Sequence, residues 1–257
     1  MPKKYQEMFD PEAIDLPDNF ASEHCFDFGI RAMRDEVLAP YPRTEKDVRR
    51  HIAEYFAMIA HLDDGIGRIL KKLEDKGIKD NTIVVFAGDN GLALGQHGLF
   101  GKQNAYEHSI RVPLVFSGPG IPRNQRRDET CYLFDIFATL ADMLGLKVPG
   151  SVEGRSLKKA IEDQSKGVDR EYLYFAYEDK LRAVKKDGFK LIEYAGDNFR
   201  QTQLFDLTAD PAETHNLAES RHEKVEELRT EMIRLRDDWD DRTHPTGRRF
   251  WGFFGDG

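Results

Sequence analysis

The chain has 257 residues, of which 40% are hydrophobic and 33% charged, and its formal net charge at pH 7 is -8. This composition is sufficient for a packed core, and the length allows one large domain or a domain followed by a smaller one. Because acidic and basic residues are interspersed and form no basic stripe, a nucleic-acid partner is not expected. No apolar run is long enough to span a membrane.

Residues 1–42 are interrupted by Pro11, Pro17, Pro40 and Pro42 and predict an extended, partly surface-bound segment. A long amphipathic helix is expected next. Thr44, with Asp47 three positions later, resembles a capping box, and apolar residues then recur at steps of three and four as far as Leu73, before Gly77. Neighbouring side chains diverge on a helix, so three polar residues inside this pattern are interpreted as a solvated face and not as a ligand cluster: His61, Asp63 and Asp64.

Residues 82–121 carry the most informative pattern. Residues 83–86 and 112–116 are apolar runs that predict two central strands of a parallel sheet, each buried on both faces. The first run stops at the sequence Gly-Asp-Asn-Gly, which predicts a sharp turn at the carboxyl end of the strand. Because open α/β sheets bind ligands at this edge, we expect the site there.

Four side chains of this stretch are candidate site residues, and each has an ordinary alternative. Asp89 and Asn90 offer hard oxygen ligands suited to calcium or magnesium, although Asp-Asn-Gly is also a common turn. Lys102 could present a compact positive charge to a phosphate-like or sulfate-like group, or simply be solvated. His97 could act as an acid, a base or a substrate contact, or serve as a hydrogen-bonding loop residue.

The carboxyl-terminal part predicts a different architecture. A second packing helix is expected over residues 132–144, so that strands and helices alternate as in a parallel sheet. From about Asp169, short apolar runs separated by turns, including Lys186-Asp187-Gly188, predict an antiparallel sheet with hairpins. A charged helix over residues 220–239 follows. The tail, residues 247–257 with Arg248 and Trp251, is interpreted as a frayed end or as a lid over a substrate cleft.

Several segments together resemble the type I sulfatases of the alkaline phosphatase superfamily. The resemblance rests on NTIVVFAGDNG, GQHGLFGK and YEHSIRVPLVFSGPGI, and on flanking segments that occur in the same order: HLDDGIGRILKKLEDKGIKDNT, DIFATLADMLGL with EGRSL, and QLFDLTADPAETHNLA. It covers nearly the whole chain. It implies an α/β fold with a parallel or mixed sheet and packing helices, followed by a small antiparallel sheet and a carboxyl-terminal helix. The implied domains are residues 1–165, part of the catalytic domain, and residues 166–257.

The same resemblance implies an activity and roles for the site residues. The activity is hydrolysis of a sulfuric ester, with a sulfated small molecule or carbohydrate as substrate and a divalent metal ion, Ca²⁺ or alternatively Mg²⁺. Asp89 and Asn90 correspond to metal ligands of the family. Lys102 corresponds to a residue that contacts the sulfate and the leaving-group oxygen, and His97 to a residue near the substrate.

The chain also departs from the family pattern. Sulfatases use a formylglycine nucleophile made in a Cys/Ser-x-Pro-x-Arg motif, which neither Cys25 nor Cys131 satisfies, and the paired aspartates of the family's amino terminus are missing. Calcium takes ~6 to 8 oxygen ligands, which two adjacent side chains cannot supply. The chain therefore resembles the carboxyl-terminal half of a sulfatase. Alternatives are a phosphate or phosphonate ester hydrolase of the same superfamily and a non-catalytic remnant.

A half of this kind has consequences for partners and location. Two apolar strands would leave open sheet edges, so self-association or association with a missing amino-terminal half is expected. The protein is expected to be periplasmic or secreted if a signal peptide precedes the missing half, and cytoplasmic otherwise.

Overall fold

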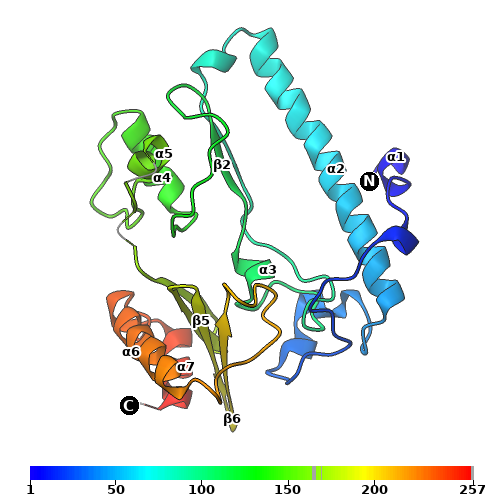
Figure 1. Ribbon diagram of the computed structural model, residues 1–257, viewed down its shortest axis with the longest axis vertical. Coiled ribbons are helices and arrows are strands. Elements are labelled where there is room, and N and C mark those ends of the chain that lie inside the picture. The colour runs from blue at the N-terminus through cyan, green and yellow to red at the C-terminus, as the bar shows by residue number, and fades with distance from the viewer. Residues whose placement is uncertain (164–165, 169, 256–257) are drawn as a thin grey trace. The chain divides into compact units, whose positions relative to one another are not determined.

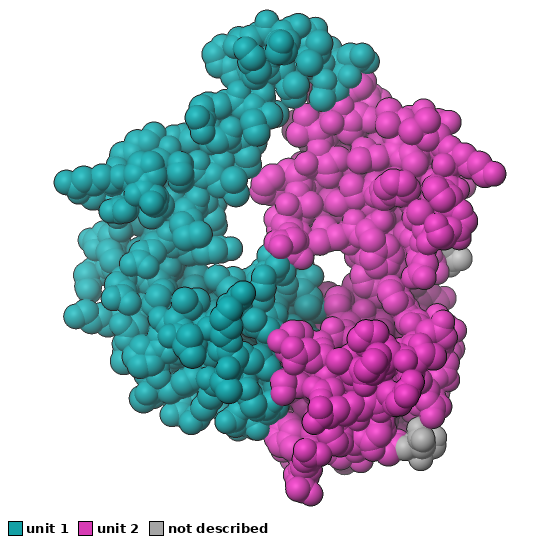
Figure 2. Space-filling model, turned by 180° about the vertical axis from the view of Figure 1, so that it is seen from behind, with its two compact units in different colours: residues 1–82, 90–111 teal, residues 83–89, 112–257 magenta. Residues whose placement is uncertain are grey.

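The computed structural model describes residues 1–163, 166–168 and 170–255 (Figure 1). The chain forms two compact units, which are coloured separately in Figure 2. Unit 1 contains residues 1–82 and 90–111, and unit 2 contains residues 83–89 and 112–257. The domain boundary predicted after residue 165, and the change of pattern predicted at Asp169, adjoin positions outside the described residues. That boundary stays a prediction.

Unit 1 is built around one long helix. Its helices are α1 (Lys3–Gln6), α2 (Glu45–Asp75) and α3 (Glu107–Ile110), with short 3₁₀ segments at Pro11–Ala13, Ile30–Ala32, Arg34–Leu38 and Lys79–Asn81. The region before α2 therefore contains short helical turns and is not simply extended as predicted. No helix in the described part of the chain is both long and apolar enough to cross a bilayer.

The helix α2 confirms the prediction from the sequence. The Thr44 hydroxyl accepts a hydrogen bond from the backbone N–H of Asp47 at 3.1 Å and so caps the first turn. The first turns of α2 pack into an apolar cluster with the preceding segment and the loop after residue 90. The buried members are Ile14, Ala39, Val48, Ile52, Ala53, Leu94 and Phe100.

The two strands predicted to be parallel form an antiparallel pair. β1 (Val84–Ala87) and β2 (Leu114–Ser117) are hydrogen-bonded with Phe86 opposite Val115, and these two side chains are 42% and 53% exposed. The prediction of parallel strands buried on both faces is therefore wrong for this pair. A parallel pair needs a crossover element, usually a helix. The segment that joins these strands contains only the four-residue α3, so it returns the chain in the opposite direction.

The rest of unit 2 confirms the predicted antiparallel sheet and helices. α4 (Asp135–Met143) and α5 (Lys158–Glu162) precede four strands, β3 (Leu173–Tyr177), β4 (Leu181–Lys186), β5 (Phe189–Gly196) and β6 (Phe199–Asp206), which pair in chain order. Asp187 and Gly188 both have positive φ in the predicted hairpin turn. α6 (His222–Asp238) confirms the charged helix, and its apolar residues pack on the sheet.

The carboxyl-terminal tail is neither frayed nor a free lid. It forms α7 (Pro245–Phe254), whose Phe250 and Trp251 are 0% and 2% exposed and belong to the same apolar cluster as α6 and the sheet. Burial of two aromatic side chains explains why this glycine-containing tail is ordered. The last two positions of the predicted tail, 256 and 257, lie outside the described residues.

Candidate functional site

The predicted site residues belong to different parts of the chain. Asp89 is exposed and lies two residues after the end of β1 in unit 2, whereas Asn90, His97 and Lys102 lie in the irregular segment 90–111 of unit 1. Three of the four candidates therefore lie on one segment of one unit. Each of these three side chains is half-buried.

Gly91 fixes the start of this segment, beside Asn90. Its backbone N–H donates to the carbonyl oxygen of Ser109 at 2.9 Å. A Cβ atom at position 91 would lie 1.8 Å from the carbonyl oxygen of His108, so no larger residue fits without backbone movement. The two ends of segment 90–111 are consequently held against each other, and the position of Asn90 is set by backbone contacts.

His97 is held by Asn19 from the amino-terminal region. Its backbone has a φ of 51°, and its N–H donates to the carbonyl oxygen of Asn19 at 2.8 Å. The side-chain amide nitrogen of Asn19 lies 3.1 Å from His97 Nε2. An amide nitrogen only donates, so in this arrangement Nε2 accepts and the proton of the neutral imidazole resides on Nδ1.

The other face of His97 is fixed by an aromatic contact with Tyr106. The two rings stack with centroids 4.0 Å apart and an interplanar angle of 14°. Tyr106 is fully buried, and its hydroxyl donates to His24 Nε2 at 2.9 Å. His24 Nδ1 donates in turn to the carbonyl oxygen of Phe26 at 2.8 Å. Burial lowers the pKa of His24, against the opposing effects of this hydrogen bond and of Asp27, which favours the neutral acceptor that Tyr106 requires.

Lys102 lies close to the carboxylate of Asp35. The backbone N–H of Lys102 donates to Gln103 Oε1 at 3.0 Å, and Gln103 Nε2 donates to Asp35 Oδ2 at 2.8 Å. Hydrogen bonds from Arg34 and Gln103 lower the pKa of Asp35, and the charge of Lys102 acts in the same direction. Asp35 is therefore an anion near the lysine, and Gln103 links the two residues.

A buried ion pair supports the loop between His97 and Lys102. Arg43 and Glu36 pair with side chains that are 0% exposed. The Glu36 carboxylate accepts from the backbone N–H of Phe100 at 3.1 Å, and Arg43 Nε donates to the carbonyl oxygen of Gly98 at 3.2 Å. Tyr41 donates its hydroxyl to Glu36, and burial together with this hydrogen bond raises the pKa of Tyr41 to about 12. The pair is thus hydrogen-bonded to the backbone at Gly98 and at Phe100, and these bonds fix the path of the loop.

The donors for the implied metal ion fit the ion in type but not in number. Asp89 and Asn90 provide carboxylate and amide oxygens, which suit calcium or magnesium. Within the described part of the chain, no group of three or more His, Cys, Asp and Glu side chains is placed to hold a metal ion. Calcium takes ~6 to 8 oxygen ligands, so Asp89 and Asn90 alone leave its coordination shell incomplete.

Sequence reasoning missed most of the supporting residues. They are Asn19, His24, Glu36, Arg43 and Tyr106. Four of the five precede the long helix in a region without a regular period. The glycines that flank His97 were visible in the sequence, and the structure explains one of them: a Cβ at Gly98 would lie 2.3 Å from the backbone of Glu23.

Comparison with known protein families gives two overlapping matches. The model of the family described as Sulfatase matches residues 2–146. A second model, described as N-sulphoglucosamine sulphohydrolase, C-terminal, matches residues 95–238. The segment 90–111 lies inside the first match, and the antiparallel sheet lies inside the second.

Curated relatives include sulfatases from several bacteria. A choline-sulfatase of Rhizobium meliloti is 36% identical over 189 residues, which is 72% of this chain and 36% of that protein. An arylsulfatase of Clostridium perfringens is 36% identical over 201 residues, 74% of this chain and 41% of that protein. The chain spans about half the length, or less, of the relatives that it matches.

Solved structures also align with this chain over part of their length. A protein whose structure was solved in complex with its substrate D-glucosamine-2-N,6-O-disulfate aligns with a TM-score of 0.68 and 26% identity over 82% of this chain and 44% of that chain. A phosphonate monoester hydrolase from Silicibacter pomeroyi aligns with a TM-score of 0.79 and 23% identity over 92% of this chain and 53% of that chain. At this identity the second likeness concerns the fold alone.

Proposed function

Because the chain belongs to the sulfatase family, we propose that it supplies the anion-binding part of a metal-dependent sulfuric ester hydrolase. The observation that carries the proposal is segment 90–111, which contains Asn90, His97 and Lys102. The buried Arg43–Glu36 pair supports its loop, and the Tyr106 ring stacks on His97. Preorganised donors and positive charges are what transfer of an anionic group requires.

The proposed roles follow from the chemistry of each side chain. The Lys102 ammonium would bind a sulfate oxygen and stabilise the charge that develops on the leaving-group oxygen. His97, which is held in place by Asn19, would contact the substrate near the same group. Asp89 and Asn90 would hold a divalent cation, most simply Ca²⁺ or Mg²⁺, which offsets negative charge on the sulfuryl group when it is bound.

The nucleophile is not among these residues. The Cys/Ser-x-Pro-x-Arg motif from which formylglycine is made does not occur in the 257 residues. We therefore propose that the activity needs an amino-terminal half of the sulfatase fold and that this chain alone turns over no sulfate ester. The substrate class proposed for the complete site is a sulfated small molecule or carbohydrate, in line with the disulfated sugar bound by one solved structure.

Activity should be tested on a reconstituted site. The chain is combined with the portion of the Clostridium perfringens arylsulfatase that precedes its matching region, coexpressed with a formylglycine-generating enzyme. We expect hydrolysis of an aryl sulfate, and Lys102→Ala should lower kcat by about 10²- to 10³-fold. Lys71→Ala, which alters an exposed helix lysine, is the control and should leave kcat unchanged. Equal activity of both variants would refute the role of Lys102.

Metal binding by the chain alone provides a second test. With two ligand side chains, calcium affinity should be no better than about millimolar. Isothermal titration calorimetry that shows a tight site abolished by Asp89→Ala would contradict the view that ligands are missing.

A second candidate is hydrolysis of phosphonate or phosphate esters. The fold is shared with a phosphonate monoester hydrolase, which aligns over 92% of the chain, so the fold alone does not separate the two activities. Lys102 and the proposed metal ion would serve a phosphoryl group equally well, since both are anionic and tetrahedral. Comparison of kcat/KM for aryl sulfate, phosphate and phosphonate esters on the reconstituted site separates the two activities. Absence of all three activities would favour a non-catalytic remnant.

A further inference from the structure

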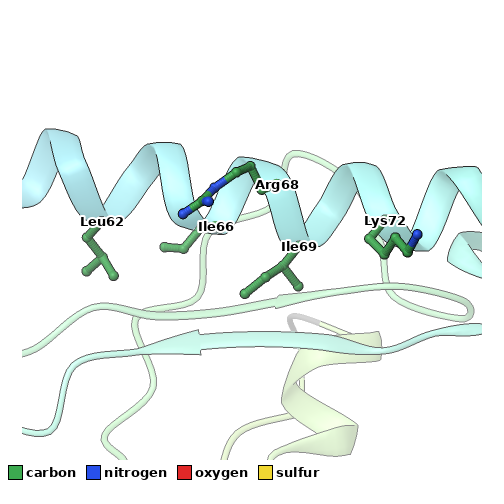
Figure 3. Close-up of a pocket in the computed structure, with 6 residues that line it drawn as sticks. Leu62, Ile66, Arg68, Ile69 and Lys72 are labelled. Atoms are coloured by element: carbon green, nitrogen blue, oxygen red, sulfur yellow. The ribbon is translucent and has the colours of Figure 1, made fainter.

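Lys102 depends on neighbouring residues to hold its backbone in place. A lysine on a helix, such as Lys72 of α2 in Figure 3, has its backbone position fixed by the hydrogen bonds of the helix itself. Lys102 lies instead in the irregular segment 90–111, and its side chain is half-buried. The place from which its ammonium can reach a substrate is therefore set by contacts within unit 1.

Two adjacent carboxylates hold the loop on either side of Lys102. Both belong to the last 3₁₀ segment before α2. Glu36 accepts a hydrogen bond from the backbone N–H of Phe100 at 3.1 Å. Asp35 Oδ2 accepts a hydrogen bond from Gln103 Nε2 at 2.8 Å. Since Lys102 lies between these two attachment points, loss of either bond would free part of the loop that carries it.

Gly101 allows the loop to approach these carboxylates closely. A Cβ atom at position 101 would lie 2.5 Å from Gln103 Oε1 and 2.9 Å from Glu36 Oε1. It would lie 3.5 Å from the Cβ atom of Asp35. A larger residue would therefore displace the Gln103 amide and the Glu36 carboxylate from their present positions.

The charge of Asp35 determines which way the Gln103 amide points. A carboxylate accepts hydrogen bonds and cannot donate them, so the amide nitrogen must face Asp35. The amide oxygen then faces the backbone N–H of Lys102 and accepts a hydrogen bond from it at 3.0 Å. Hydrogen bonds from Arg34 and Gln103 lower the pKa of Asp35, which keeps the carboxylate ionised at neutral pH. Asp35 thus orients the amide that holds the Lys102 backbone.

This arrangement fixes the backbone of Lys102 and leaves its side chain able to turn. Asp35 Oδ1 accepts a hydrogen bond from Arg34 Nε at 2.7 Å, so an exposed arginine offsets the charge of the carboxylate. The Lys102 ammonium stands beyond the fixed backbone on a flexible four-carbon stem. It can therefore turn toward an anionic group from a fixed starting point.

We propose that Asp35 and Gln103 are positioning residues for Lys102 in ester hydrolysis. The inference rests on the proposed function, in which Lys102 stabilises charge on the leaving-group oxygen. A charged group contributes most when it is in place before that charge develops. A displacement of about 1 Å can cost about 10²-fold in rate. Asp35 and Gln103 act through Lys102 and contact no reacting atom themselves.

Exchange of hydrogen-bond polarity tests the link on the 257-residue chain without any substrate. Gln103→Glu sets two carboxylates against each other, so hydrogen exchange of the Lys102 N–H, followed by NMR, should become at least about tenfold faster. In the double variant Asp35→Asn, Gln103→Glu, an amide again faces a carboxylate, with donor and acceptor exchanged and the net charge unchanged. Its exchange rate should return to within about threefold of that of the unmodified chain.

The same variants are then measured on the reconstituted site with an aryl sulfate. Gln103→Glu should lower kcat by about 10- to 100-fold, and the double variant should recover most of the loss. Because the double variant keeps the new carboxylate at position 103, its recovery separates bond polarity from added charge. Gln6→Glu, the same change at an exposed residue of α1, is the control and should leave kcat unchanged.

A further variant separates positioning of Lys102 from general support of the site. In a Lys102→Ala background, Gln103→Glu should lower kcat no further, because its effect passes only through the lysine. An additional loss of about tenfold in that background would show that Gln103 supports other parts of the site, and would overturn the proposal.

Two other results would also overturn it. One is an exchange rate of the Lys102 N–H that Gln103→Glu leaves unchanged. The other is a kcat that Gln103→Glu leaves unchanged while Lys102→Ala lowers it. A reconstituted site that hydrolyses no ester with the unmodified chain would refute the proposed function and the catalytic consequence together. The exchange rates would still decide separately whether Asp35 and Gln103 hold Lys102 in place.

Discussion

Asp241 accepts hydrogen bonds from several elements of the carboxyl-terminal part of unit 2. Its carboxylate accepts two hydrogen bonds from Arg182, at 2.6 and 3.0 Å, and one each from the Tyr174 hydroxyl and Trp251 Nε1 at 2.8 Å. Arg182 is a 1% exposed side chain of the sheet, and Trp251 belongs to α7. One carboxylate thus joins sheet and terminal helix.

Replacing Asp241 by Asn should destabilise the protein. The substitution leaves the buried Arg182 charge without a counter-charge, which is worth about 3 kcal/mol in the free energy of unfolding. Urea denaturation followed by tryptophan fluorescence measures the change. Asp238→Asn is the matched control, because Asp238 is 54% exposed in its pair with Arg234, and it should change stability by less than about 1 kcal/mol.

The pH dependence of the stability lost in Asp241→Asn follows from the pKa of Asp241. Burial alone would raise the pKa, but hydrogen bonds from Arg182, Trp251 and Tyr174 outweigh it and place the pKa below the ordinary value of 3.8. A carboxyl with a lowered pKa stabilises the folded state above its unfolded pKa and loses this contribution as pH falls through the folded value. The deficit of Asp241→Asn should be constant from about pH 7 to 5 and shrink below about pH 4. A deficit that grows on acidification would contradict the assignment.

At the same scale, the sequence provides candidate site residues, which stay predictions, but not the residues that support them. Asp89, Asn90 and Lys102 lie in a recognisable motif between two apolar runs. Tyr106 and His24 are 82 positions apart and meet only because the segment before α2 folds against segment 90–111. Residue types and spacing carry no signal for such a contact, which depends on tertiary packing.

At the scale of elements, local periodicity predicted helices and hairpins, but not strand direction. The pattern of α2 and its Thr44 cap was sufficient to place the helix within a few residues. The runs that became β1 and β2 were recognisable as strands, yet their antiparallel pairing depends on the path of the chain between them. Apolar residues at every position indicated burial, and the partial exposure of both strands shows that burial also requires neighbouring elements.

The hairpin between β4 and β5 provides a test of turn chemistry. Gly188 has a φ of 78°, and a Cβ there would lie 2.6 Å from Thr208 Oγ1. Gly188→Ala should therefore lower the free energy of unfolding by about 1 to 2 kcal/mol. Gly196→Ala is the control at the end of β5, where a Cβ meets no atom within 4 Å, and it should be neutral within about 0.5 kcal/mol. Equal effects of the two substitutions on the free energy of unfolding, measured by urea denaturation, would show that a side chain at position 188 does not strain the turn.

At the scale of the molecule, the two units have separate apolar interiors. The cluster of unit 1 includes Val48 and Phe100, and that of unit 2 includes Leu191 and Phe250; the two share no residue among those described. Composition indicated only that the chain could form one or two domains. The interruption of unit 2 by residues 90–111 could not be predicted, because it depends on which apolar surfaces pack together.

Separate interiors predict two unfolding transitions. Both tryptophans, Trp239 and Trp251, belong to unit 2, so fluorescence reports on that unit. Far-UV circular dichroism also reports on unit 1 through the 31 residues of α2. If each interior unfolds on its own, the urea midpoints from the two probes differ, because a single two-state transition would make them coincide.

Two variants can assign the transitions. Thr44→Ala removes the cap of α2 and should shift the dichroism transition by about 1 kcal/mol while leaving the fluorescence midpoint in place. Asp241→Asn should shift the fluorescence midpoint and leave the unfolding of α2 unchanged, since the hydrogen-bond partners of Asp241 all lie in unit 2. Both variants are needed because the midpoints from fluorescence and dichroism would also differ if only the surroundings of a tryptophan changed. If both probes coincide and both variants shift them together, the two interiors unfold as one cooperative unit, and the energetic division of the chain at residues 82–90 and 111–112 is wrong.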